Sequence, residues 1–203
     1  MISSFKFENL PCRVIFGSGT LSTLKAEIER LGGKRALVLT TPQQMAEGSK
    51  LGATLGPLYA GIFYDATMHT PVEVTERAIT AMQAYDADCV VALGGGSTTG
   101  LGKALALRTG IKQICIPTTY AGSEMTPILG ETKSGLKTTV RDPAILPETV
   151  IYDVDLTLTL PVSLSTTSGI NAIAHAVEAL YAQDANPVTS LMAEDGIRAL
   201  ARA

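Results

Sequence analysis

Short apolar runs alternate along the chain with stretches whose apolar residues recur every three or four positions. The runs are typical of buried strands, and the recurring stretches predict helices. We expect strands at 13–16, 35–40, 61–64, 89–93, 113–116 and 150–152, and helices at 20–31, 71–85 and 101–108. Residues 48–58 are ambiguous, because two glycines dilute a helical pattern there. This alternation predicts the α/β class, with a Rossmann-like, mostly parallel sheet and helices on both faces.

The pattern changes after Leu160-Pro161, where only helices are expected, at 163–181 and from 187 to the end. We therefore predict an α/β domain at residues 1–160 and the beginning of an all-helical domain at 161–203. Two helices cannot enclose a core, so the helical part is expected to be truncated. Residues 120–149 are rich in glycine and proline, and so long a connection is often functional or contains a hairpin.

A glycine-rich turn, Gly94-Gly-Gly-Ser-Thr98, lies between a buried strand and a helix. Glycines let backbone N–H groups approach an anion, and the N-terminus of the following helix adds partial positive charge. We therefore predict phosphate binding by Gly94, Gly95, Gly96, Ser97 and Thr98 rather than a merely flexible turn. The usual dinucleotide fingerprint, GxGxxG followed by an acidic residue, is absent.

Two other strand ends carry hydroxyl groups that could contact the same ligand. Thr118 and Thr119 follow one strand, and Thr40, Thr41 and Pro42 follow another. In an open parallel sheet the carboxyl ends of the strands line the ligand crevice. We expect both segments to contact a dinucleotide, which makes residues 1–160 a dinucleotide-binding domain. Residues 40–42 include no acid that would repel the 2′-phosphate of NADPH and no arginine that would bind it.

His175 lies on a predicted helix four residues after Asn171, so the two side chains share one helical face. A histidine among alanines is more often structural than catalytic. An Asp–His pair at this spacing would suit a divalent metal, but Asn171 offers only a neutral amide oxygen, which weakens a metal site.

The composition of the chain argues against nucleic-acid-binding and membrane proteins. Of the 203 residues, 17% are charged, and the formal net charge is −3, which leaves no electrostatic footprint for nucleic acid or an anionic membrane. No run of 18 apolar residues predicts a membrane span. Cys12, Cys89 and Cys115 are an odd number and widely spaced, and Cys89 and Cys115 lie within apolar runs, so we expect buried thiols rather than a disulfide, and a cytoplasmic protein.

Several motifs in order resemble the iron-containing alcohol dehydrogenase superfamily. They are Phe16-Gly-Ser-Gly19, Gly94-Gly-Gly-Ser97, Pro117-Thr-Thr-Tyr-Ala-Gly-Ser-Glu124, Leu156-Thr-Leu-Thr-Leu-Pro161 and Ser168-Gly-Ile-Asn-Ala-Ile-Ala-His-Ala-Val-Glu178. The resemblance covers the whole chain. It implies a dehydroquinate synthase-like architecture, in which an α/β domain binds a nicotinamide dinucleotide and a helical domain holds a divalent metal through one Asp and three His.

Three departures from that superfamily pattern resemble its maleylacetate reductase branch. Gly100 stands where an Asp is usual, the 117–124 motif is shortened, and Asn171 stands where the metal-binding Asp is usual. The resemblance implies NADH- or NADPH-dependent reduction of maleylacetate to 3-oxoadipate in aromatic and chloroaromatic degradation, with no metal. It implies that His175 is catalytic and that Tyr120, Ser123, Asn171 and His175 bind substrate.

Two alternatives stay open beside the reductase. One is a metal-dependent alcohol dehydrogenase of the same superfamily, against which Asn171 argues. The other is a non-catalytic nucleotide-binding fragment. The expected partners are a small-molecule substrate, with chlorinated analogues not excluded, and a second copy of the chain in a homodimer, with neither nucleic acid nor a membrane.

Overall fold

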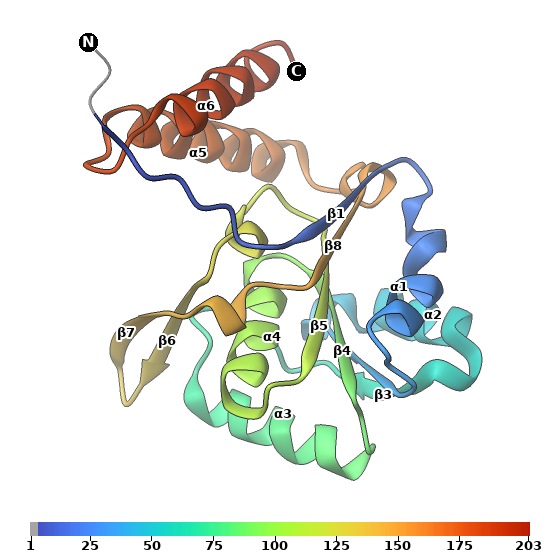
Figure 1. Cartoon of the computed structure of the whole chain (residues 1–203). Coiled ribbons are helices and arrows are strands. Elements are labelled where there is room, and N and C mark those ends of the chain that lie inside the picture. Colours follow the sequence, from blue (N-terminus) through green and yellow to red (C-terminus); the bar gives the residue numbers. More distant parts are fainter. Residues whose placement is uncertain (1–3) are drawn as a thin grey trace. The chain divides into compact units, whose positions relative to one another are not determined.

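Six parallel strands form a single sheet in the order β1-β8-β5-β4-β2-β3 (Figure 1). The computed structural model describes residues 4–203. The strands are β1 (Arg13–Gly17), β2 (Ala36–Leu39), β3 (Tyr59–Phe63), β4 (Cys89–Gly94), β5 (Lys112–Pro117) and β8 (Thr149–Asp153). All six lie within a few residues of the predicted strands, which confirms the mostly parallel sheet. The first and last strands pair with each other, Arg13 opposite Thr149.

Helices cover both faces of this sheet, as predicted. They are α1 (Leu24–Arg30), α2 (Met45–Leu55), α3 (Val72–Ala84) and α4 (Gly96–Thr109). Alternate residues of a strand point to opposite faces. Leu37 and Leu39 accordingly join the core cluster of α3 and α4, whereas Ala36 and Val38 join that of α1 and α2. Short 3-10 turns lie at Thr20–Thr23, Pro42–Gln44, Gly56–Leu58, Ser123–Met125, Pro143–Ile145 and Val154–Thr157.

Glycines explain where the helices differ from their predicted ranges. The ambiguous stretch is helix α2, because a Cβ on Gly52 would lie 2.4 Å from Tyr59 Cε2 and only glycine lets the helix pack this close to β3. Helix α4 begins at Gly96, five residues earlier than predicted, since burial outweighs the low helix propensity of its glycines. The predicted helix 20–31 starts with a 3-10 turn and becomes α-helical only at Leu24.

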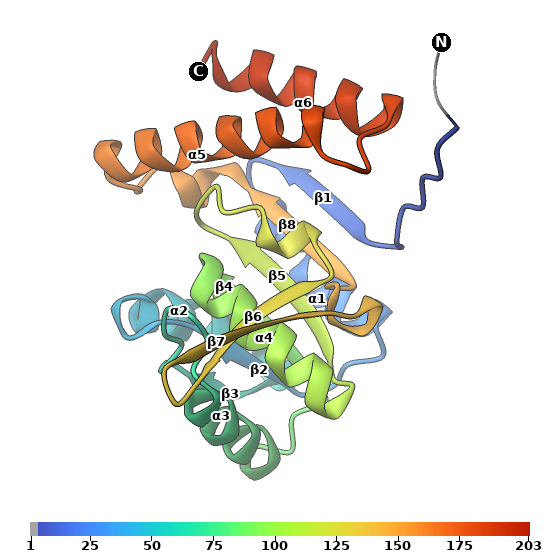
Figure 2. The same cartoon turned by 90° about the vertical axis from the view of Figure 1, so that its left-hand side faces the viewer.

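The connection 120–149 contains an antiparallel hairpin of β6 (Ile128–Lys133) and β7 (Leu136–Arg141). Figure 2 shows this hairpin lying across α4. Leu129 and Ile145 pack on Ala104, so α4 is enclosed between the sheet and the hairpin. The enclosure accounts for the unbroken burial of α4 from Thr98 to Ala106.

The chain divides into two compact units. Residues 11–159 form one, and Leu160–Ala203 with the described part of Met1–Leu10 form the other. Residues 1–10 were predicted to belong to the α/β domain, but residues 4–12 form no strand or helix that would attach them to the sheet. In the second unit α5 (Val162–Tyr181) contacts α6 (Pro187–Leu200), close to both predicted helices. Within residues 4–203 no helix is long and apolar enough to cross a membrane.

The buried carboxylate of Glu27 links helix α1 to strands β1 and β8 at the edge of the sheet. Glu27 is 5% exposed and accepts hydrogen bonds from Arg30 Nε at 2.7 Å and Arg13 Nε at 3.1 Å. It also lies 3.3 Å from Thr149 Oγ1, so one side chain joins α1, β1 and β8. Burial opposes ionisation of Glu27, but the two arginines outweigh it, and the pKa of Glu27 is lowered.

We expect Glu27→Gln to lower the free energy of unfolding by about 1–2 kcal/mol at pH 7, because it removes charge-assisted hydrogen bonds. A lowered carboxyl pKa gives stability that is present above the unfolded-state pKa, about 4.3, and is lost as the pH falls through the folded-state value. The difference from wild type should therefore vanish in acid. Urea denaturation at pH 7 and pH 3 measures it, with Glu29→Gln, an exposed residue of the same helix, as the control. An equal loss at both pH values would contradict the electrostatic role.

Candidate functional site

The carboxyl ends of β2, β4 and β5 bring three predicted segments together. Thr118 N donates to Gly94 O at 3.0 Å. Gln44 Nε2 donates to Thr118 Oγ1 at 3.1 Å, and Thr41 Oγ1 donates to Gln44 Oε1 at 3.4 Å. Gln44 thus links the strand end at Thr41 to the one at Thr118. These strand ends flank the point where the chain reverses direction across the sheet, which is where ligands bind in open α/β sheets.

The turn into α4 leaves little room for a side chain at its first two positions. Gly94 has φ +144°, and a Cβ there would lie 2.6 Å from Gln44 Oε1. A Cβ on Gly95 would lie 3.0 Å from Thr119 Oγ1. Thr98 Oγ1 donates back to Gly95 O at 2.9 Å, which holds the turn in shape. Between Gln44 and Thr119 the turn therefore presents only backbone atoms.

Gly95 is the N-cap residue of α4 and has no side chain with which to cap the helix. The first N–H groups of a helix have no partner within the helix, and they carry partial positive charge. Gly96 is exposed and Ser97 is half-buried, so this end of the 14-residue helix is accessible. The arrangement is suited to a phosphate group.

Two of the predicted contact residues are less accessible than their position suggests. Thr98 is fully buried, and its hydroxyl is used in the hydrogen bond to Gly95 O within the turn. Thr40 is also fully buried, and among the described residues its Oγ1 has no hydrogen-bond partner. Thr41 is half-buried and Pro42 is exposed at the start of a 3-10 turn, so these two form the accessible part of the β2 end.

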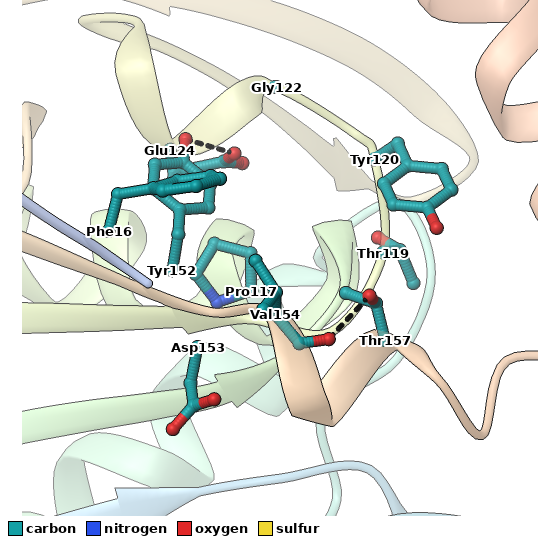
Figure 3. A pocket seen from close by; sticks show the side chains of 10 residues that line it. All are labelled: Phe16, Pro117, Thr119, Tyr120, Gly122, Glu124, Tyr152, Asp153, Val154 and Thr157. Atoms are coloured by element: carbon teal, nitrogen blue, oxygen red, sulfur yellow. Dashed lines mark hydrogen bonds between the residues drawn. The ribbon is translucent and has the colours of Figure 1, made fainter. Parts of the chain in front are cut away.

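A cavity of about 290 Å³ lies beside Thr119 and Tyr120 (Figure 3). Phe16 and Tyr152 border it with their rings, whose centroids are 6.2 Å apart. Tyr152 Oη donates to Glu124 Oε1 at 2.7 Å, and this carboxylate is 3% exposed. Burial, and then the charge of Glu124, raises the pKa of Tyr152, so the phenol stays protonated and donating.

Ser123 lies away from Tyr120, in the wall of a second cavity of about 180 Å³. Lys103, from the middle of α4, donates to both the carbonyl and the hydroxyl of Ser123. Burial lowers the pKa of Lys103 to about 8, against the opposing influence of Cys115 and Glu124. The two predicted substrate residues of this loop, Tyr120 and Ser123, therefore line different cavities.

Asn171 and His175 lie on α5, in the helical unit rather than in the unit that holds the glycine turn. Both are exposed and one helical turn apart. His175 Nδ1 lies 3.2 Å from Glu178 Oε2, so the imidazole has a carboxylate partner on its own helix. Across residues 4–203 no three His, Cys, Asp or Glu side chains lie close enough together to hold a metal ion.

Sequence reasoning missed four residues of the site: Gln44, Lys103, Glu124 and Tyr152. Lys103 gave a usable signal, because it is the one charge in the run Leu101-Gly-Lys-Ala-Leu-Ala-Leu107, and a lone charge in so apolar a helix needs a partner. No local sequence pattern indicated Gln44 or Tyr152. Gln44 is 74 residues from its partner Thr118, and Tyr152 is 28 residues from its partner Glu124.

Comparison with known proteins agrees with this geometry. The chain is similar to maleylacetate reductases from Rhizobium sp. strain MTP-10005, with 62% identity over 98% of this chain, and from Burkholderia cepacia, with 54% over all of it. It spans 57% of the length of each. A crystal structure of maleylacetate reductase from Agrobacterium tumefaciens matches the whole chain with a TM-score of 0.97 and 59% identity, over 58% of that protein.

The family model for iron-containing alcohol dehydrogenase matches residues 11–154. This range contains every strand of the parallel sheet, the glycine turn and all residues that line the two cavities except Thr157. The chain therefore belongs to the iron-containing alcohol dehydrogenase family.

Proposed function

We propose that this chain serves the NADH- or NADPH-dependent reduction of maleylacetate to 3-oxoadipate. The observation that carries the proposal is the uncapped N-terminus of α4 behind the Gly94-Gly95 turn, tied to the β5 end through Thr118. The similarity to maleylacetate reductases supports the substrate, and the family supports an oxidoreductase.

The cofactor's pyrophosphate would lie against the N–H groups at Gly95, Gly96 and Ser97. Thr118 and Thr119 would contact the adjoining ribose. The cavity beside Thr119 is bordered by the rings of Phe16 and Tyr152, which suits one of the two flat bases of a dinucleotide. At the β2 end, Thr41 and Pro42 present neither an acid nor an arginine, so both NADH and NADPH fit.

Reduction of an enone needs a donor for the oxygen that becomes negative. A bound nicotinamide supplies a hydride to the alkene carbon β to the ketone. His175 is our proposed catalytic donor: its Nδ1 lies 3.2 Å from Glu178 Oε2, and a ring N–H would donate to the substrate oxygen. Asn171, one turn away, would add an amide N–H, and Tyr120 and Ser123 are further proposed substrate contacts.

The family name implies iron, so we tested whether the described residues could hold it. Asn171 contributes a neutral amide oxygen and His175 one imidazole nitrogen, while the neighbouring carboxylate, Glu178, is occupied with His175. Two neutral donors do not make a divalent metal site. We therefore propose that the reaction proceeds without a metal.

We further propose a cytoplasmic homodimer. Cys12, Cys89 and Cys115 are all free thiols, which suits a reducing compartment. Ile170, Leu191 and Met192 are at least 63% exposed on α5 and α6, and exposed apolar patches of this kind mark interaction surfaces.

Gly95→Val should weaken NADH binding by more than tenfold, because its side chain would meet Thr119 and block the approach of the pyrophosphate to the backbone. Fluorescence titration of the purified chain measures the affinity. Gly196→Val on α6 is the matched control, since a Cβ there has nothing within 4 Å. Unchanged affinity in a folded Gly95→Val variant would remove the turn from the site.

A turnover assay distinguishes the proposed reductase from a nucleotide-binding fragment and from a metal-dependent alcohol dehydrogenase. NADH oxidation that depends on maleylacetate would support the proposed reaction. Binding of NADH without any such oxidation would favour a nucleotide-binding role. Activity toward simple alcohols in place of maleylacetate would favour a metal-dependent dehydrogenase.

Treatment with a metal chelator should leave NADH affinity and maleylacetate reduction unchanged, because Asn171 supplies no charged ligand. The rate before and after chelation is compared in a buffer stripped of metals. Activity that is lost and then returns when iron or zinc is added would contradict the metal-free reaction.

A further inference from the structure

Gln44 lies in a turn whose shape is fixed by the protein's own contacts. Pro42 opens the 3-10 turn that follows β2, and its ring fixes the backbone angle φ at that position. Gln44 N donates to Thr41 O at 3.0 Å, which closes the turn. Thr41 Oγ1 donates to Gln44 Oε1 at 3.4 Å. Gln44 is therefore held both at its backbone and at its side-chain oxygen.

The absence of a side chain on Gly94 lets the Gln44 amide reach Thr118. Strand β4 lies between β2 and β5 in the sheet, so a side chain that joins the ends of β2 and β5 must pass the end of β4. Gly94 is the last residue of β4, and a Cβ on it would lie 2.6 Å from Gln44 Oε1, too close for a real side chain. Across this gap Gln44 Nε2 reaches Thr118 Oγ1 at 3.1 Å.

This hydrogen bond decides how the Thr118 hydroxyl can bind a ligand. An amide N–H only donates, so Thr118 Oγ1 is the acceptor and its own proton must point elsewhere. Within residues 4–203 the Thr118 hydroxyl donates to no protein acceptor. Thr118 is half-buried, and its backbone N–H is already used by Gly94 O. The side chain therefore presents a hydrogen-bond donor at the carboxyl edge of the sheet.

A dinucleotide at this edge would place acceptors beside that donor. Its phosphate and ribose groups are rich in oxygen acceptors, and the glycine turn proposed for the pyrophosphate is joined to Thr118 through Gly94 O. A hydroxyl group rotates freely unless a neighbour restricts it. A donor whose direction is set before the ligand arrives loses less freedom on binding, so the contact contributes more to affinity.

We propose that Gln44 is a positioning residue, which fixes the Thr118 hydroxyl as a donor to a phosphate or ribose oxygen of the cofactor. Gln44 acts through Thr118 and does not itself contact the cofactor. The inference rests on one half of the proposed function, namely that the chain binds NADH or NADPH. It is independent of the substrate that is reduced.

The test is a double-mutant cycle on NADH affinity, measured by fluorescence titration of wild type, Gln44→Leu, Thr118→Val and the double variant. Gln44→Leu should weaken NADH binding about fivefold, which corresponds to one neutral hydrogen bond. In the Thr118→Val background the same change should have almost no effect, because the hydroxyl that Gln44 positions is gone. Thr118→Ser keeps a hydroxyl, so Gln44→Leu should weaken binding there by the same factor as in wild type.

A second pair of variants reverses the polarity of the contact. A glutamate carboxylate only accepts, so in Gln44→Glu the Thr118 O–H would turn toward it and away from the cofactor. NADH binding should weaken about tenfold or more, because a charged acceptor competes strongly for the proton. Gln43→Glu is the matched control: it makes the same change of charge at the neighbouring exposed position and should stay within about twofold of wild type.

ADP-ribose locates the contact on the cofactor. It carries the pyrophosphate and both riboses but no nicotinamide, and Gln44→Leu should weaken its binding by the same factor as that of NADH. A loss seen with NADH alone would overturn the assignment to a phosphate or ribose oxygen. Thermal melting without ligand shows whether each variant is folded. Gln44→Glu is nearly isosteric with wild type and carries the test if Gln44→Leu does not fold.

The outcomes separate this role from the proposed function. An equal loss from Gln44→Leu with and without Thr118→Val would overturn the positioning role, since Gln44 would then act independently of that hydroxyl. Unchanged NADH affinity in folded Gln44 variants would also overturn it and leave the reductase intact. Failure of wild type to reduce maleylacetate, with the cycle as expected, would overturn the proposed function alone. Absence of NADH binding in wild type would overturn both.

Discussion

The close packing of α4 between the sheet and the β6–β7 hairpin is the constraint on which the rest of this structure depends. A helix enclosed on both sides needs small residues where backbones meet, and Gly102 would place a Cβ only 3.2 Å from Gln113 Oε1 on β5. The same enclosure buries Lys103, whose charge must then find acceptors, and these come from the Ser123 turn and the start of β6. The position of the helix therefore fixes the loop beyond β5 as well.

That packing also divides the surroundings of α4 into two chemically different regions. Toward Thr119 the cavity is largely apolar and bordered by aromatic rings, and both of its buried carboxylates are hydrogen-bonded, Glu124 to Tyr152 and Asp153 to the backbone of Gly19 and Leu21. Toward Thr70 the cavity is polar and basic. Gly96, at the exposed N-terminus of the helix, lines this polar cavity.

The sheet could be predicted from the sequence because each strand is a short apolar run bounded by glycine, proline or charge. The glycine turn and the threonines at Thr118 and Thr119 could be assigned to the carboxyl edge for the same reason. The start of α4 could not be predicted from the sequence. The segment Gly-Ser-Thr-Thr-Gly has a low intrinsic helix propensity, and only burial of the helix between two layers offsets that low propensity. The contacts of Gln44 and Tyr152 depend on segments distant in sequence, and no local pattern encodes them.

The pairing of β1 with β8 has a consequence for the order in which the fold assembles. Strands β2 to β5 can form their sheet from residues 36–117, but β1 has no neighbour other than β8, and Arg13 must wait for Thr149. Contacts this distant in sequence are slow to form, because the intervening loop must close first. The Glu27 ion pairs and the bonds from Gly19 and Leu21 to Asp153 belong to the same late step. The edge of the sheet beside the aromatic cavity, where Phe16 meets Tyr152, joins strands far apart in sequence, so a chain that is still being synthesised lacks that wall until residue 153 is available.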